Sequence, residues 1–126
     1  MMRSTIIRAG FLAAGLLCGS GPVVASTYDA IAIDDEPGLK GGQAGYGVGE
    51  GDSADDANAG ALRNCRSSGN GKCVVAITYQ TCGAYASSRE HSGIGTGNTE
   101  ASARGAAREQ CGIEACRVVV SDCVGK

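Results

Sequence analysis

Residues 45–65 read GYGVGEGDSADDANAGALRNC and carry the clearest structural pattern of this chain. Glycine occupies every second position of the first seven residues, so a strand formed there has one face without side chains, which another backbone can approach closely. A helix that begins after the N-cap residue Ser53 supplies that backbone. Its Ala57, Ala61 and Cys65 recur at intervals of four residues and share one side. The sequence thus predicts an alanine-faced helix packed on a glycine-faced strand.

The same arrangement returns 46 residues later in the chain. A shift of 46 positions aligns residues 47–65 with residues 93–111 without a gap, and Thr99 then takes the N-cap position of Ser53. The small residues of the two helices correspond as well: Ala57, Ala61 and Cys65 align with Ala103, Ala107 and Cys111. Two copies are too few for a solenoid, so we expect them to complete one shared core.

Strand patterns flank each helix. Ile31 and Ile33 alternate with small or polar residues in the segment 30–34, which is strand periodicity. After each helix a polar loop leads to a β-branched run, at residues 73–79 and 116–120.

The combined pattern predicts an α+β fold. We expect two ββαβ-like repeats, at about residues 28–81 and 82–123, packed as one domain that disulfides staple. The sheet is expected to be mostly antiparallel, with two alanine-rich helices and a pseudo-twofold relation between the repeats. Proline and glycine in residues 36–42 predict a turn after the first strand.

The N-terminus has the pattern of an export signal. Two arginines and no acid precede an apolar run that ends in a small-residue cleavage site at Ala25. The run is too short to cross a bilayer, and Leu17 before Cys18 differs from the small residue that lipoprotein processing needs. We therefore interpret residues 1–25 as a cleaved signal peptide. Residues 26–126 are expected to form a single periplasmic or secreted domain without a membrane span.

The expected export determines how the cysteines are interpreted. Beyond the signal, six cysteines remain, an even number that predicts three disulfides in an oxidising compartment. A small core makes such bridges necessary, because residues 26–126 contain no Phe or Trp and only 14 Val, Ile and Leu. His91 is the lone histidine and no Cys-x-x-Cys occurs, so we expect no metal site.

The repeat suggests how the cysteines pair. In each copy one cysteine ends the helix and another begins the next strand, which favours two local bridges. The two cysteines that remain lie at the ends of strands that the alignment treats as equivalent, and we expect them to join the two halves. The predicted pairs are Cys65–Cys73, Cys111–Cys116 and Cys82–Cys123.

Several short motifs are spread over about residues 28–123. They are Tyr-x-Ala-Ile-Ala at 28–32, the alanine-rich helix ending in Cys65, Cys-Val-Val at 73–75, Cys-Gly-Ala at 82–84, Gly-Ile-Gly-Thr-Gly-Asn-Thr at 93–99, and Cys116-x-Val118 to Cys123. In combination they resemble the bacterial family known as domain of unknown function 4189. The resemblance implies a small exported protein with one such domain, and it implies no particular chemistry. The chain departs from the family pattern in having no Trp.

Composition and motifs exclude several function classes. Lys plus Arg is 11 and Asp plus Glu is 13, a net charge of −2, which argues against a nucleic-acid partner. A loose phosphate-loop pattern, Gly49-x-Gly51-x-x-Ala54, lacks a following Lys and a Rossmann context, so we expect no cofactor.

Two hypotheses about function remain. The first is a non-enzymatic module that binds a protein or a cell-envelope component through its loops or an exposed sheet edge, a class that includes effectors and inhibitors. The second is a small extracytoplasmic hydrolase that uses Asp52 and Asp56 with His91. The position of the aspartates near a helix start is explained by helix capping and the helix dipole, without a catalytic site. The histidine lies in a polar segment that is expected to be a solvated loop. We therefore assign no catalytic residue and favour the binding module.

Overall fold

The computed structural model describes residues 26–35 and 43–126. Its elements, in chain order, are β1 (Tyr28–Asp34), β2 (Gly45–Gly51), α2 (Ala54–Ser67), β3 (Val74–Tyr79), β4 (Cys82–Ser87), β5 (Ser92–Gly97), α3 (Glu100–Cys111) and β6 (Arg117–Cys123). The order ββαβ therefore occurs twice, in agreement with the predicted fold class. The signal peptide expected at residues 1–25 and the turn expected at 36–42 lie outside the described residues.

Each ββαβ unit forms its own antiparallel sheet of three strands. The strand order is β2-β1-β3 in the first sheet and β5-β4-β6 in the second. Corresponding residues have the same register, since Ala30 lies opposite Gly49 and Ala84 lies opposite Gly95. Both sheets also carry a bulge at the same place, after Ile31 in β1 and after Tyr85 in β4. The antiparallel strands that the sequence predicts are thus divided between two similar sheets.

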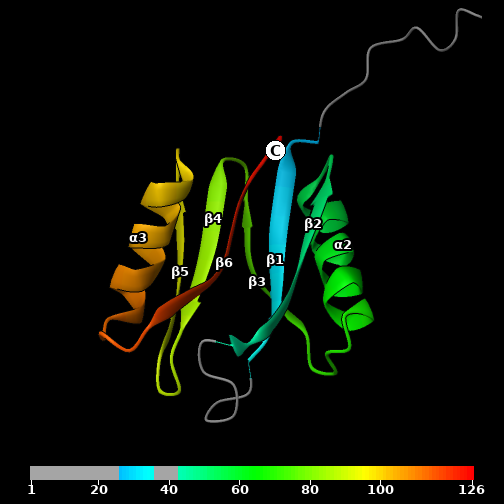
Figure 1. Ribbon diagram of the computed structural model, residues 1–126. Helices are drawn as coiled ribbons and strands as arrows, with labels where there is room; N and C mark the ends of the chain where they lie inside the picture. The colour runs from blue at the N-terminus through cyan, green and yellow to red at the C-terminus, as the bar shows by residue number, and fades with distance from the viewer. Residues whose placement is uncertain (1–25, 36–42) are drawn as a thin grey trace, which may run out of the picture.

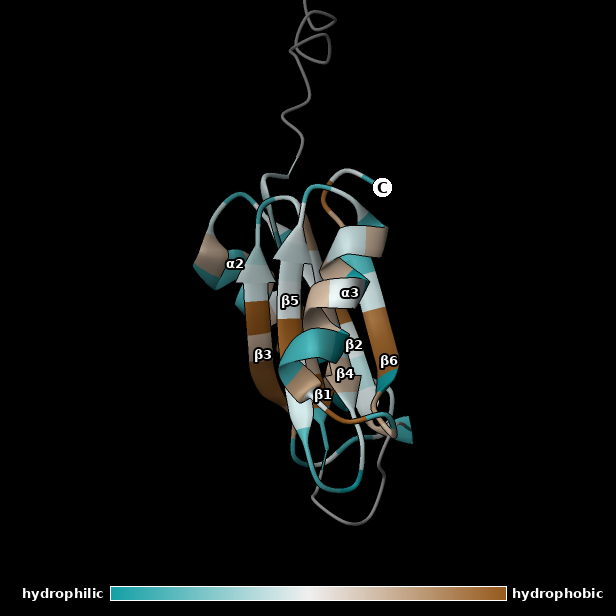
Figure 2. Ribbon diagram, turned by 90° about the vertical axis from the view of Figure 1, so that its left-hand side faces the viewer, coloured by the Kyte–Doolittle hydropathy of each residue, from teal (hydrophilic) through white to brown (hydrophobic). Residues whose placement is uncertain are grey.

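The two sheets face each other, and one helix covers the outer side of each (Figure 1). Helix α2 packs on β1 and β2, and α3 packs on β4 and β5. Turned by 90°, the molecule shows β3 and β6 at opposite edges (Figure 2). The fold is therefore a stack of four layers, in the order helix, sheet, sheet, helix.

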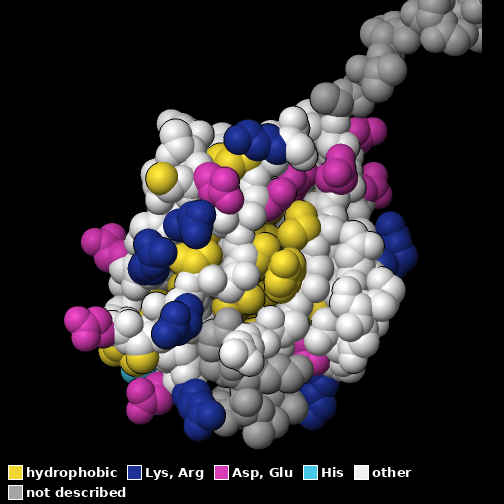
Figure 3. Space-filling view, viewed as in Figure 1, with side chains coloured by type: hydrophobic (Ala, Val, Ile, Leu, Met, Phe, Trp, Pro, Cys, Tyr) yellow, Lys and Arg dark blue, Asp and Glu magenta, His cyan; other side chains and the backbone are white. Residues whose placement is uncertain are grey.

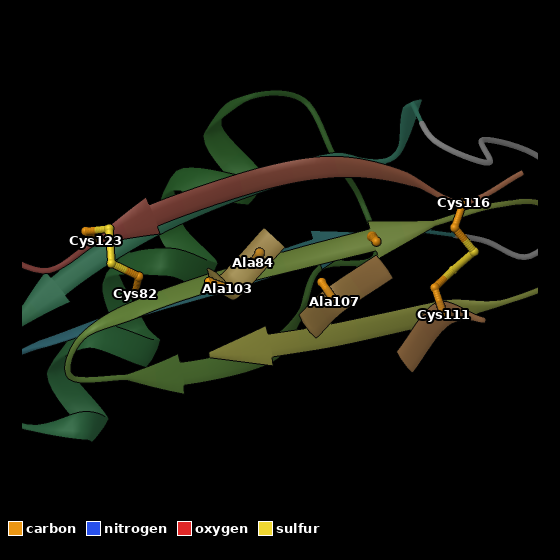
Figure 4. Close-up of a cluster of buried hydrophobic side chains, with 8 residues drawn as sticks. Cys82, Ala84, Ala103, Ala107, Cys111, Cys116 and Cys123 are labelled. Carbon is orange, nitrogen blue, oxygen red and sulfur yellow. A yellow bond between two sulfur atoms is a disulfide. The ribbon is translucent and has the colours of Figure 1, made fainter. Parts of the chain in front are cut away.

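The outer layers are thin because the glycine face of β2 or β5 packs against the alanine face of α2 or α3, as the sequence predicts. A Cβ atom added at Gly49 would overlap the backbone nitrogen of Ala61, and one added at Gly95 would overlap the backbone nitrogen of Ala107. The strand and helix backbones therefore touch directly. In the second unit, alanines lie between two disulfides that close the layer at both ends (Figure 4).

Side-chain hydrogen bonds cap the two helices and join them to the outer strands β2 and β5. The Ser53 hydroxyl accepts a hydrogen bond from the backbone N–H of Asp56, and Thr99 does the same for Ser102, so both predicted N-caps are confirmed. Side chains of the helices reach the outer strands as well. Asn64 Nδ2 donates to the backbone oxygen of Val48 (2.5 Å), and Gln110 Oε1 accepts from the backbone N–H of Ile94 (2.7 Å).

The three disulfides are the pairs that the repeat symmetry predicts. They join Cys65 to Cys73, Cys82 to Cys123 and Cys111 to Cys116, with Cα–Cα distances of 6.1, 4.0 and 6.2 Å.

One expectation about these bridges is wrong. Cys82 begins β4 and lies directly opposite Cys123 of β6, so this disulfide joins two neighbouring strands of the second sheet. It does not join the two halves. Cys82 begins the first strand of the second unit, in the position that Tyr28 has in β1, and therefore belongs to the same repeat, residues 82–123, as Cys123.

Candidate functional site

The inner faces of the two sheets form a central apolar layer. Its buried members are Ile31, Ile33, Tyr79, Tyr85 and Val120. The strand alternation that directs Ala30 and Ala32 towards α2 directs the isoleucines towards the second sheet. This layer is the shared core that the sequence predicts, and it links the two units without a disulfide between them.

One end of this central layer is acidic. Asp29 of β1 is only 5% exposed, although it shares a strand face with Ile31. The Tyr79 hydroxyl of β3 donates a hydrogen bond to Asp122 Oδ2 of β6, over 2.8 Å. This bond crosses from the first sheet to the second. Gly83 makes room for it, because a Cβ there would overlap the Tyr79 ring.

The electrostatics of this end are unusual. Burial, followed by hydrogen bonding and repulsion from Asp122, raises the pKa of Asp29 from 3.8 to about 7. Glu50, which lies opposite Asp29 in the register, adds to this effect. Burial and the hydrogen bond to Asp122 also raise the pKa of Tyr79 far above its ordinary value. The tyrosine therefore stays protonated and donates at neutral pH, and the raised pKa of Asp29 favours its protonated form.

The opposite end of the central layer holds a second polar contact between the sheets. Asp35 Oδ2 accepts hydrogen bonds from the Tyr85 hydroxyl (2.5 Å) and from Ser87 Oγ (2.6 Å). Burial, and then the bond to Asp35, raise the pKa of Tyr85 to about 12. A cavity of about 120 Å³ lies beside this group, and His91 is among its lining residues.

The residues of the hydrolase hypothesis do not meet. Asp52 and Asp56 are exposed where β2 passes into α2, and His91 is exposed in the loop between β4 and β5. Figure 1 shows these two places at opposite ends of the fold. The aspartates lie at the start of α2, where they complement the helix dipole. A second cavity, of about 360 Å³, lies near the Cys82–Cys123 bridge and is lined in part by Asn98 and Thr99.

Between β2 and β6, on the side shown in Figure 3, a patch of hydrophobic side chains is visible from outside. Tyr46 and Val48 alternate on β2 with the glycines that face α2, so they point towards the second sheet. Tyr46 is 44% exposed. From β6, Val119 and Val120 pack in the same cluster as Val48. We call Tyr46, Val48 and Val119, together with the buried Val120 of the central layer, the open groove.

The open groove has free strand edges and an acidic end. In the described part of the chain, β2 pairs with β1 and β6 pairs with β4, so each strand has an outer edge that no other strand covers. Along the same strand faces, Glu50 follows Val48 and Asp122 follows Val120, each after two residues. The acidic group around Asp29 therefore closes one end of the groove.

Neither polar contact between the sheets was predicted from the sequence. A signal for one of them was present, because Asp29 stands on the same strand face as Ile31 and Ile33, where an acid is out of place. Asp122 likewise shares a strand face with Val120, but nothing in the sequence indicates that these two acids lie at the same end of the fold. Among the described residues, no group of three or more His, Cys, Asp or Glu side chains is arranged to hold a metal ion. None of the described helices has the length and apolar character of a membrane span.

The fold and its bridges define a class of small α+β proteins in which two similar ββαβ units stack face to face and disulfides stabilise each unit. The model of one family, described as Domain of unknown function (DUF4189), matches residues 28–123, and the chain belongs to that family. The match confirms the resemblance seen in the sequence. No curated protein and no solved structure matches the chain significantly.

Proposed function

We propose that this chain is an exported binding module that takes up an extended segment of a partner protein in the open groove. The observation that carries the proposal is the groove itself, which combines apolar side chains with the uncovered edges of β2 and β6. Extended segments bind such edges through backbone hydrogen bonds, and side-chain contacts add specificity.

The acidic end of the groove narrows the choice of partner. Glu50 and Asp122 continue the strand faces that Val48 and Val120 supply. A segment whose apolar side chains are followed by Lys or Arg complements both the apolar part and the acidic end. We therefore expect partners with short apolar and basic stretches, in the cell envelope or outside the cell.

Export is supported by the chemistry of the cysteines. The six cysteines of the described residues form three disulfides, which persist in oxidising compartments such as the periplasm. The charged, apolar and small-residue pattern of residues 1–25 fits the same route. Expression of the full chain in a bacterium, followed by intact-mass and non-reducing peptide mapping of the periplasmic fraction, tests this part. We expect cleavage after Ala25 and three bridges, whereas an uncut chain with free thiols contradicts export.

Binding is tested with an array of synthetic ten-residue peptides of varied charge and hydropathy. We expect apolar and basic peptides to bind, and the substitution Tyr46→Glu to abolish their binding, because it places a charge in the groove. The matched control is Ala59→Glu, which adds the same charge at an exposed position of α2. Equal loss in both variants, or binding that ignores peptide charge and hydropathy, contradicts the proposal. Circular dichroism of each variant confirms that it is folded.

A further inference from the structure

The acidic end of the central layer is built as a contact between the two sheets. Asp29 and Tyr79 stand opposite each other in the first sheet, and both act on Asp122 of the second. In the second sheet the residue opposite Asp122 is Gly83, whose missing side chain admits the Tyr79 ring. The carboxyl groups of Asp29 and Asp122 are thus held together by the stacking of the sheets.

Among the described residues, the titratable groups that act on Asp29 are all acidic. Glu50 faces it from β2, Tyr79 from β3 and Asp122 from β6. When one proton is shared, the two carboxyl groups form a hydrogen bond across the sheets. When both carboxyls are ionised, they repel each other in a place where water screens charge poorly.

We propose that Asp29 and Asp122 form a proton-operated latch, which holds the two sheets together at this end while the pair carries a proton and loosens when the proton is lost. The latch does not depend on the proposed binding function. Because Asp29 is buried, we assign its proton to the contact between the sheets and not to proton transfer with a substrate. Loosening would act on β6, one wall of the open groove, whose other contacts in its sheet are with β4.

The pKa of Asp29 gives the direction of the effect. It rises from 3.8 to about 7 on folding, so the folded protein holds this proton more tightly than the unfolded chain. The contribution to stability is complete below pH 3.8 and is lost as pH rises to about 7. One proton changes the unfolding equilibrium constant by up to about tenfold per pH unit.

Urea unfolding of the exported, oxidised protein at several pH values between about 4.5 and 8.5 tests the latch, with the linkage slope as readout. We expect Asp29→Asn to flatten the pH dependence, because the amide cannot lose a proton in this range. Asp55→Asn, which removes an exposed carboxylate on α2, is the matched control and should leave the dependence unchanged. An unchanged slope in Asp29→Asn overturns the proposal.

A second measurement needs no variant. Carbon-detected NMR of the Asp29 carboxyl in the wild-type protein should show a titration midpoint close to 7. Amide hydrogen exchange of β6, corrected for the intrinsic pH dependence, should lose protection over the same interval while α2 keeps it. A midpoint close to the ordinary value of 3.8, or uniform loss of protection in both elements, overturns the latch even where Asp29→Asn fails to fold.

Discussion

Replacement of Gly49 by alanine is the most direct test of the packing between helix and strand. The added Cβ would lie 2.5 Å from the backbone oxygen of Ala57 and 2.5 Å from the carbonyl carbon of Gly60. Ordinary contacts need about 3.5 Å, so α2 must move away by about 1 Å. Because the obstructing atoms belong to the helix backbone, no side-chain rotation relieves the overlap.

The cost of this movement can be worked out from the structure. A gap of about 1 Å forfeits up to about half of the dispersion energy of the atoms that it separates. The atoms concerned belong to a fully buried layer that includes Ala57 and Ala61. We therefore expect Gly49→Ala to lower the free energy of unfolding by about 3 kcal/mol, the upper part of the range for overpacked cores. That is a large share of the roughly 5 to 15 kcal/mol that holds a domain folded.

The chain contains a matched control for this prediction. Gly105 lies inside α3, is exposed, and would gain a Cβ in open space. Gly105→Ala should therefore stabilise the protein by roughly 0.5 to 1 kcal/mol, the helix preference of alanine. Urea unfolding followed by circular dichroism, with the disulfides intact, measures both variants. If Gly49→Ala unfolds within about 1 kcal/mol of the wild type, the helix and strand backbones are not in tight contact, because overpacking normally costs more than that.

Two further predictions concern the bridges and a tyrosine. By the chain-entropy model, replacing both Cys82 and Cys123 by serine should lower the free energy of unfolding by about 4 kcal/mol, because this disulfide closes a loop of 41 residues. The same change at Cys111 and Cys116, which close only 5 residues, should lower it by about 2 kcal/mol. Thermal unfolding of the two double variants checks this order. The Tyr85 hydroxyl should ionise near pH 12, as measured by ultraviolet absorbance. Since its folded pKa exceeds the ordinary 10.0, stability should fall as pH rises from 10 to 12, and Tyr85→Phe should lessen that fall.

Local structure was predictable because its causes are close together in the sequence. Alternating glycines, followed by alanines at intervals of four, specify a strand and helix whose backbones touch, and this pairing needs no information from the rest of the chain. Ser53 and Thr99 cap their helices through hydrogen bonds to residues three positions ahead. The bridges Cys65–Cys73 and Cys111–Cys116 span one turn between helix and strand, so they follow from the same local order.

The ββαβ units, their antiparallel strands and the thin layer under each helix follow from the amino-acid sequence, because they depend on neighbours along the chain. Packing in three dimensions sets which sheet faces meet, and with them the open groove and the contacts of Asp29 and Asp35 with the opposite sheet. It also decided that Cys82 and Cys123 lie in one sheet. These contacts could not be predicted because strand alternation shows which side chains share a face of a sheet, whereas it carries no information about the surface on which that face packs. Asp29 and Asp122 are 93 residues apart in the sequence, and only the stacking of the two sheets brings their carboxyl groups together.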